Sequence, residues 1–79
     1  MRVPRDCSGK DLIRALEKMG YQVTRQSGSH IRLTTHDHGE HHLTVPNHDP
    51  IKVGTLSGIL GEVAFHFQMT REQVIERLF

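Results

Sequence analysis

Apolar residues recur at helical spacing in the first part of the chain, as they do on the buried side of an amphipathic helix. Ser8 precedes this stretch and Asp11 follows three residues later, which is the spacing of an N-terminal capping box. Gly20 follows the last apolar position and is typical of a helix C-terminus. The pattern therefore predicts a helix between residues 8 and 20. Its apolar side consists of Leu12, Ile13, Leu16 and Met19.

The end of the chain shows the same helical periodicity twice. One helix is predicted to begin at an N-cap formed by Thr55 or Ser57. Its apolar side consists of Leu56, Ile59, Leu60, Val63 and Phe67. Thr70, followed by Gln73, forms a second capping box and predicts a final helix. The apolar side of that helix consists of Val74, Ile75, Leu78 and Phe79.

Between these helices, apolar and polar residues alternate, which is the pattern of strands with one covered face. Strands are predicted at residues 21–26, 30–35 and 41–45, separated by a turn at Ser27–Gly28 and a polar loop at residues 36–40. The predicted inward side chains are Tyr21, Val23, Ile31, Leu33, Leu43 and Val45. The order of elements predicts an α+β fold, in which a three-stranded antiparallel sheet has helices packed on one face.

Composition agrees with one small folded domain, which we expect to span residues 1–79. Of the 79 residues, 35% are hydrophobic and 24% are charged. No apolar run approaches the length of about 20 residues that crosses a bilayer. Cys7 is the single cysteine and has no internal partner for a disulfide. This indicates a reducing compartment, so we expect the protein in the cytoplasm.

The net charge of +1 conceals an asymmetry along the chain. Residues 1–32 contain seven basic residues against three acidic ones, whereas the remainder contains three against six. The seven basic residues are Arg2, Arg5, Lys10, Arg14, Lys18, Arg25 and Arg32. A basic N-terminal half favours contact with a polyanion such as a nucleic acid.

His30 is the strongest candidate for catalysis. It follows the turn that ends at Ser29, and strand alternation places it on the outward face together with Arg32. Histidine transfers protons near neutral pH, and the arginine guanidinium suits a phosphate-bearing substrate. The competing interpretation is a solvent-exposed strand histidine without a function. The turn, the outward position and the neighbouring arginine favour a functional role.

The histidine-rich segment at residues 36–42 is a second candidate. It contains four imidazoles and two carboxylates, which resembles a zinc or nickel site in composition. Consecutive strand residues such as His41 and His42 are, however, expected to point to opposite faces. A solvated hairpin tip is therefore the favoured interpretation, and we expect no metal and no cofactor. The members of the segment are His36, Asp37, His38, Glu40, His41 and His42.

Three further positions carry weaker signals. His48 lies in the loop between Pro46 and Pro50, where it either donates a proton or locks the loop by hydrogen bonding. Lys52 lies near a predicted helix start, where backbone N–H groups suit a phosphate. Cys7 has no histidine near it in the sequence and is expected either to pack in the interior or to have no role.

Five of these segments, in the same order along the chain, resemble the HicA family of toxin ribonucleases. The resemblance runs from about residue 8 to the C-terminus, and its most specific part is the Gly-Ser-His element together with the Gly-Thr-Leu helix start. The segments are Ser8–Leu16, Gly20–Tyr21, Gln26–His30, Val45–His48 and Lys52–Leu60. The histidine-rich segment at residues 36–42 is not part of the family's motif.

This resemblance implies a double-stranded-RNA-binding-like fold and a place in a type II toxin–antitoxin system. In such a system the toxin cleaves mRNA and arrests translation, and a HicB-type antitoxin neutralises it. The resemblance places the family's catalytic histidine at His30.

The leading hypothesis is a metal-independent endoribonuclease in which His30 is the general base. The residues expected to bind the RNA phosphate are Lys10, Arg25, Ser29 and Arg32. The sequence leaves open whether His48 or water protonates the leaving oxygen. Two alternatives are a non-catalytic module of the same fold that binds RNA or a protein, and a metal-dependent hydrolase that uses the histidine-rich segment.

Overall fold

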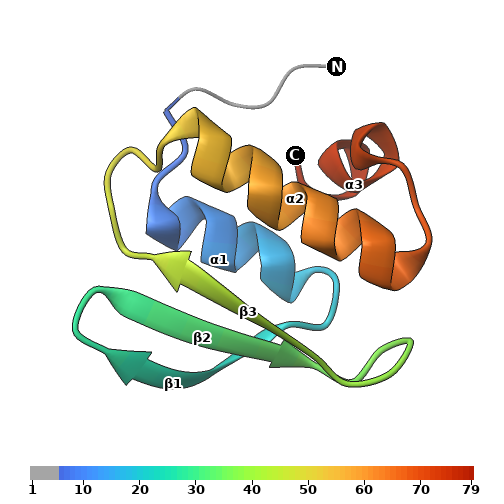
Figure 1. The fold of residues 1–79 in the computed structure, drawn as a ribbon, viewed down its shortest axis with the longest axis horizontal. Helices are drawn as coiled ribbons and strands as arrows, with labels where there is room; N and C mark the ends of the chain where they lie inside the picture. Colours follow the sequence, from blue (N-terminus) through green and yellow to red (C-terminus); the bar gives the residue numbers. More distant parts are fainter. Residues whose placement is uncertain (1–5) are drawn as a thin grey trace.

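The computed structural model describes residues 6–79, which form three helices and one antiparallel sheet (Figure 1). The helices are α1 (Gly9–Glu17), α2 (Val53–Phe67) and α3 (Arg71–Leu78). The strands are β1 (Gln22–Ser27), β2 (His30–Thr35) and β3 (His41–Pro46), hydrogen-bonded in the order β1-β2-β3. The predicted α+β class and order of elements are confirmed. Arg2 and Arg5 of the predicted basic half lie outside the described residues.

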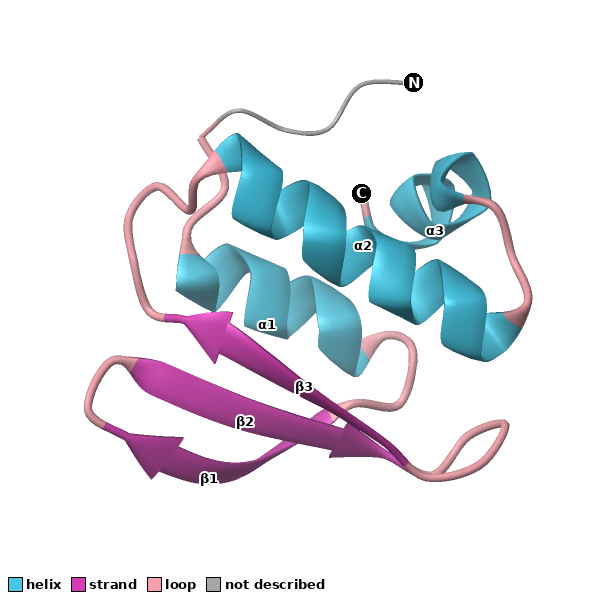
Figure 2. Cartoon of the chain, in the orientation of Figure 1, coloured by secondary structure: helices cyan, strands magenta, loops and turns pink. Residues whose placement is uncertain are grey.

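The three helices lie on one side of the sheet, so that the opposite face is open in the described part of the chain (Figure 2). α1 packs against β1 and β3, while α2 contacts β3 on one side and α3 on the other. None of the helices within residues 6–79 has the length and apolarity that a membrane crossing requires. The sheet therefore has one buried face and one face available for contacts.

Both predicted capping boxes are present. In α1, the Asp11 N–H donates to Ser8 Oγ at 3.1 Å, and the Ser8 N–H donates to Asp11 Oδ2 at 3.3 Å. In α3, the Gln73 N–H donates to Thr70 Oγ1 at 3.1 Å, and the Thr70 N–H donates to Gln73 Oε1 at 2.8 Å. Gly20 has φ +85° just beyond α1, a conformation that favours glycine. These local signals were sufficient to place the two helices.

The predicted N-terminus of α2 is wrong. The helix begins at Val53, before both Thr55 and Ser57, and its N-cap residue makes no side-chain capping hydrogen bond. Ile51, just upstream, is buried, and its N–H donates to the carbonyl of Cys7 at 2.8 Å. This tertiary contact fixes where the chain enters the helix, and it outweighs the preference of about 1 kcal/mol for a polar cap.

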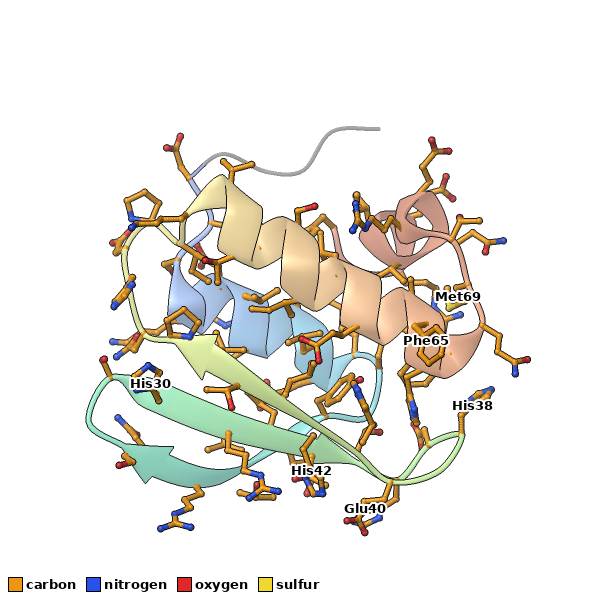
Figure 3. All side chains as sticks on the ribbon, viewed as in Figure 1. His30, His38, Glu40, His42, Phe65 and Met69 are labelled. Carbon is orange, nitrogen blue, oxygen red and sulfur yellow. The ribbon has the colours of Figure 1, made fainter. Side chains whose placement is uncertain are left out.

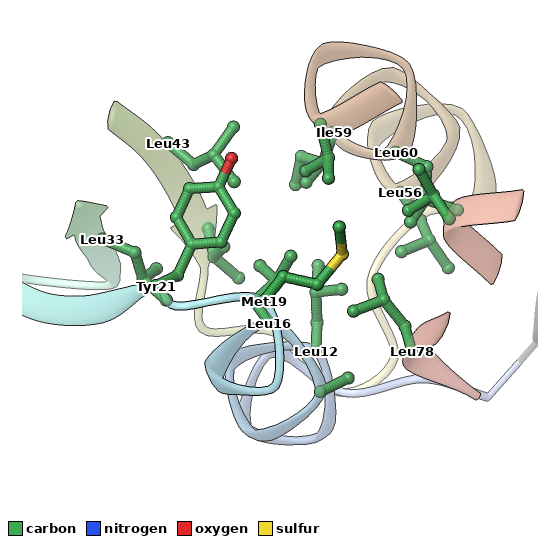
Figure 4. Close-up of a cluster of buried hydrophobic side chains, with 14 of the residues drawn as sticks. Leu12, Leu16, Met19, Tyr21, Leu33, Leu43, Leu56, Ile59, Leu60 and Leu78 are labelled. Carbon is green, nitrogen blue, oxygen red and sulfur yellow. The ribbon is translucent and has the colours of Figure 1, made fainter. Parts of the chain in front are cut away.

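The core lies between the sheet and the helices (Figure 4). It combines the predicted stripes of the helices with the inward residues of β2 and β3, and it includes Cys7, as expected. Its largest hydrophobic side chains with almost no exposed surface are Tyr21, Leu12, Leu16, Leu33, Ile51, Leu56, Leu60 and Leu78. Residues from every described helix therefore meet in one cluster.

Four predicted core positions differ from the structure. Ile13 of α1 is only partly buried and packs against the core. Val23 is 48% exposed although it pairs with the buried Leu33, because β1 is an edge strand whose residues are all exposed. Phe79 follows the end of α3 and is 50% exposed. Phe67, the last residue of α2, is only partly buried and packs on the margin of the core.

Gly9 at the start of α1 provides the first testable prediction. A β-carbon there would lie 2.6 Å from the Pro46 carbonyl oxygen and 2.9 Å from Asn47 Cα, so Gly9→Ala requires the backbone to move. We expect a loss of about 1–3 kcal/mol in the free energy of unfolding, measured by urea denaturation. The control is Gly58→Ala in α2, where a β-carbon meets nothing within 4 Å. That change should stabilise the protein by up to about 1 kcal/mol, and equal effects of the two substitutions would contradict the close contact.

Candidate functional site

A two-residue hairpin turn delivers His30 to the first position of β2. The turn consists of Gly28 and Ser29, and it joins Ser27 to His30, which are paired across the strands. Gly28 has φ +58°, as expected for glycine at the first central position of a tight hairpin turn. A β-carbon at Gly28 would meet nothing within 4 Å. Glycine is therefore favoured here by the backbone conformation, and the surface beside the turn is open.

His30 is exposed on the open face of the sheet, as strand alternation predicted. The next residue, Ile31, is buried under the helices, and Arg32 is exposed again on the same side as His30. The histidines with side-chain hydrogen bonds within residues 6–79 are His41, His42 and His66. The imidazole of His30 is therefore available to a ligand.

Arg25 and Arg32 lie side by side on the same open face. They are partners across β1 and β2, both are exposed, and neither forms an ion pair with a carboxylate of residues 6–79. Like charges placed directly opposite in a sheet destabilise it. An anion bound between the two guanidinium groups would relieve this repulsion, and a phosphate has the geometry that arginine recognises best.

Hydrogen bonds tie the loop at residues 47–50 to the turn before His30. The Asn47 N–H donates to the Ser29 carbonyl at 2.6 Å, and the Gly9 N–H donates to the His48 carbonyl at 2.8 Å. The turn, this loop and the N-terminus of α1 consequently share one end of the molecule (Figure 1). Lys10 is exposed at this end, but it belongs to the helix layer, whereas His30 faces the opposite side of the sheet.

The structure thus brings some of the predicted site residues together and leaves others apart. His30, Arg25 and Arg32 share the open face, and Ser29 immediately precedes His30. His48 holds the loop through its backbone carbonyl, while its imidazole is exposed and forms no hydrogen bond with residues 6–79. The main chain of His48 therefore holds the loop, and its side chain is not required for this role.

His41 and His42 point to opposite sides of β3, as their consecutive positions predicted. The hydroxyl of Tyr21 is 2.8 Å from His41 Nδ1, and the His41 ring stacks on His66 at a centroid distance of 4.4 Å. His66 Nε2 donates to the carbonyl of Asp37 at 2.9 Å. His41 therefore helps to join the loop after β2 to the C-terminal end of α2. His66 lies far from His41 in sequence, and no local pattern signalled this pairing.

His42 belongs to a different group on the open face. Its Nε2 donates to Glu40 Oε2 at 2.8 Å, and its Nδ1 is 2.8 Å from Thr34 Oγ1. Within residues 6–79, no three side chains of His, Cys, Asp or Glu converge in a way that could hold a metal ion. The histidine-rich segment is therefore divided between two environments, and it presents no metal-ligand set in the described residues.

Several of these contacts change acid–base properties. Burial, with a smaller contribution from the charge of His66, lowers the pKa of His41. Burial also raises the pKa of the Tyr21 hydroxyl and, with a smaller contribution from Asp11, the pKa of the Cys7 thiol. The hydrogen bond from His42 lowers the pKa of Glu40, which keeps that carboxylate ionised.

Comparison with known proteins identifies one related family. The model of a family described as "HicA toxin of bacterial toxin-antitoxin" matches residues 9–64. Neither a curated protein nor a solved structure gives a significant match to the chain. The matched range contains the turn, all three strands and the loop at residues 47–50.

The second prediction concerns stability as a function of pH. Because the pKa of His41 is lower in the folded protein than in the unfolded chain, the unfolded state takes up a proton first as the pH falls. The stabilisation from neutral His41 is complete above the unfolded pKa of about 6.5, and it is lost as the pH falls from there toward the folded pKa. We expect His41→Gln to flatten the dependence of the free energy of unfolding on pH below about 6.5.

The control is His48→Gln, which removes an exposed imidazole from the loop and should preserve the slope. Glu40 contributes in a separate range, because its lowered pKa means that stability is lost only below the usual carboxyl value of 4.5. A slope below about pH 6.5 that is identical in wild type and His41→Gln would contradict the role given to His41.

Proposed function

Because this chain belongs to the HicA family of bacterial toxin–antitoxin toxins, we propose that it is a metal-independent endoribonuclease that cleaves mRNA. The observation that carries the proposal is an accessible imidazole, His30, beside two arginines that lack carboxylate partners within residues 6–79. A proton-transfer group next to cationic side chains is the minimum needed to cleave a ribose phosphodiester. We propose one domain for this function, acting on mRNA in the cytoplasm.

His30 acts as the general base in the proposed reaction. It takes the proton from a ribose 2′-OH, and the resulting oxygen attacks the adjacent phosphorus. The bond from phosphorus to the 5′ oxygen of the next nucleotide breaks, and that oxygen receives a proton from the imidazole of His48 or from water. The products are a 2′,3′-cyclic phosphate and a free 5′-OH. General base catalysis of this kind contributes a factor of about 10²–10⁴.

The phosphate is held by the arginine pair. Charge increases on the non-bridging oxygens as the 2′ oxygen attacks, and Arg32, two residues from His30 on the same face, is placed to stabilise it. Arg25 adds a second guanidinium from the neighbouring strand. Lys10 and Ser29 are at the same end of the molecule and contact the flanking part of the RNA in this proposal.

The partner of a toxin in this family is an antitoxin. We propose a HicB-type antitoxin that neutralises the protein by keeping RNA away from His30. The open sheet face is exposed over β1 and at His30, so a protein that covers this face would block the proposed site directly.

A second candidate is a module of the same fold that binds RNA or a protein without cutting. The same arginine pair supports it, because Arg25 and Arg32 attract phosphates whether or not His30 reacts. The two candidates differ in the fate of the RNA and in the effect of expression on growth. A binding module retains RNA intact and does not arrest growth when expressed, whereas the nuclease releases products with a free 5′-OH.

The third prediction tests the general base. His30→Asn should lower RNA cleavage by at least about 10²-fold, because the amide cannot accept the 2′-OH proton at neutral pH. Its stability should stay within about 0.5 kcal/mol of wild type, since His30 is exposed. Cleavage is measured with purified protein in EDTA, and growth arrest is scored on expression.

The matched control is His38→Asn, at the opposite end of β2. His38 has φ +59°, which asparagine tolerates, and its ring packs against the edge of Phe67. This variant should cleave RNA as wild type does. Retained cleavage in His30→Asn would overturn the mechanism, and loss of wild-type cleavage in EDTA would revive metal-dependent hydrolysis.

The fourth prediction tests the arginine pair through the salt dependence of binding. Each phosphate contact to a single strand contributes about 0.7 to the slope of log K against log salt concentration. Arg32→Gln should reduce that slope by about 0.7, measured by anisotropy with a labelled RNA that lacks reactive 2′-OH groups. Arg14→Gln removes an exposed charge from α1, in the helix layer, and should leave the slope unchanged. Equal slopes in wild type and Arg32→Gln would show that Arg32 makes no phosphate contact.

A further inference from the structure

The open sheet face contains a shallow groove that extends from Arg25 and Arg32, beside the proposed site, to the end of β2 that is remote from His30. Its volume is about 370 Å³, and its charged lining comes from all three strands and the loop between β2 and β3. The charged and titratable residues of the groove are Arg25, Arg32, His36, Glu40 and His42. Figure 3 shows Glu40 and His42 near one end of β2 and His30 at the other. We refer to this feature as the open-face groove.

Hydrogen bonds fix the imidazole of His42 in the open-face groove. One ring nitrogen bonds to Thr34 Oγ1 and the other donates to the Glu40 carboxylate, both at 2.8 Å. Thr34 is in turn 3.1 Å from Thr24 Oγ1, which connects β3 to β1 across β2. A side chain held at both ring nitrogens is pre-positioned and loses little conformational entropy when a ligand binds nearby.

The groove already holds an anionic group of the chain itself. The carboxylate of Glu40 lies 2.8 Å from His42 Nε2 and 3.9 Å from His36 Nδ1. Arg25 and Arg32 line the same groove and form no ion pair within residues 6–79. A phosphate carries the same hydrogen-bond-accepting oxygens as a carboxylate, so it can replace Glu40 beside His42, while the two arginines remain with the phosphate that is cleaved.

The end of the groove at His42 is too far from His30 to hold the phosphate that is cleaved. His42 is paired with Thr34, which is four residues from His30 along β2. At about 3.3 Å per strand residue this separation is about 13 Å. A strand of RNA whose reacting phosphate lies at His30 and Arg32 would therefore place a nearby nucleotide over the His42 end of the groove.

We propose that the His42 end of the open-face groove is a second phosphate subsite for the RNA strand cleaved at His30, and that Glu40 is an internal competitor which the phosphate displaces. This inference rests on the proposed function, because it assumes that single-stranded RNA follows the open face. If the phosphate displaces Glu40 and binds His42, the substitutions Glu40→Gln and His42→Gln have opposite effects on RNA affinity. Nonspecific damage to the groove would instead weaken RNA binding in both variants.

The test measures binding of 2′-O-methyl RNA, which lacks the attacking hydroxyl and is not cleaved. One oligonucleotide is long enough to extend from His30 across the groove, and a dinucleotide reaches only one of the two places. Glu40→Gln should tighten binding of the long strand by about two- to fivefold, and His42→Gln should weaken it by a similar factor. Both effects should be smaller for the dinucleotide, which cannot occupy the His30 site and the groove together.

Glu72→Gln is the matched control, because it removes the same charge from the first turn of α3. Its effect on affinity for the long strand should be smaller than that of Glu40→Gln. Unchanged affinity in both groove variants, weakening in both, or an equal effect of Glu72→Gln would overturn the subsite. Binding is measured here without cleavage, so these results do not depend on the cleavage assay of His30→Asn. Retained cleavage in His30→Asn would overturn the proposed mechanism and leave the subsite untouched.

Discussion

The contact between the start of α1 and the end of β3 determines the arrangement of the candidate site. Gly9 has no side chain, so its backbone can approach Pro46 and Asn47, and its N–H donates to the carbonyl of His48. The same loop donates from Asn47 to Ser29, the residue before His30. The position of the proposed general base is therefore connected to the helix layer by two backbone hydrogen bonds. A side chain at position 9 would disturb this connection without touching His30.

Placing every described helix on one side separates the stabilising part of the sheet from its chemically accessible part. The residues of β2 that face the helices form the core, while His30 and Arg32 contribute nothing to that core. The exposed face can consequently carry a pair of like charges, Arg25 and Arg32, whose repulsion the core must offset. Their repulsion is a small local cost that bound phosphate would remove. This division explains why substitutions on the open face should change RNA affinity more than stability.

Features set by neighbouring residues were predictable from the sequence, and those set by distant residues were not. The capping boxes at Ser8 and Thr70 were predicted because both partners lie within one helical turn. The start of α2 depends on the burial of Ile51, and the exposure of Val23 depends on the place of β1 at the edge of the sheet. Neither has a local signature. For the candidate site, alternation placed His30 and Arg32 on one face. The partners of the histidine-rich segment come from other elements and required the structure.

The three strand histidines on β2 and β3 differ in what occupies their ring nitrogens, and this difference separates their roles. His41 contacts the hydroxyl of Tyr21 and stacks on His66, so it serves the fold. Both nitrogens of His42 are engaged, by Glu40 and Thr34, which suits positioning more than proton transfer. A general base needs a free lone pair directed toward the substrate. His30 has no side-chain hydrogen-bond partner within residues 6–79. Of the three strand histidines, it is therefore the one best suited to act as a general base.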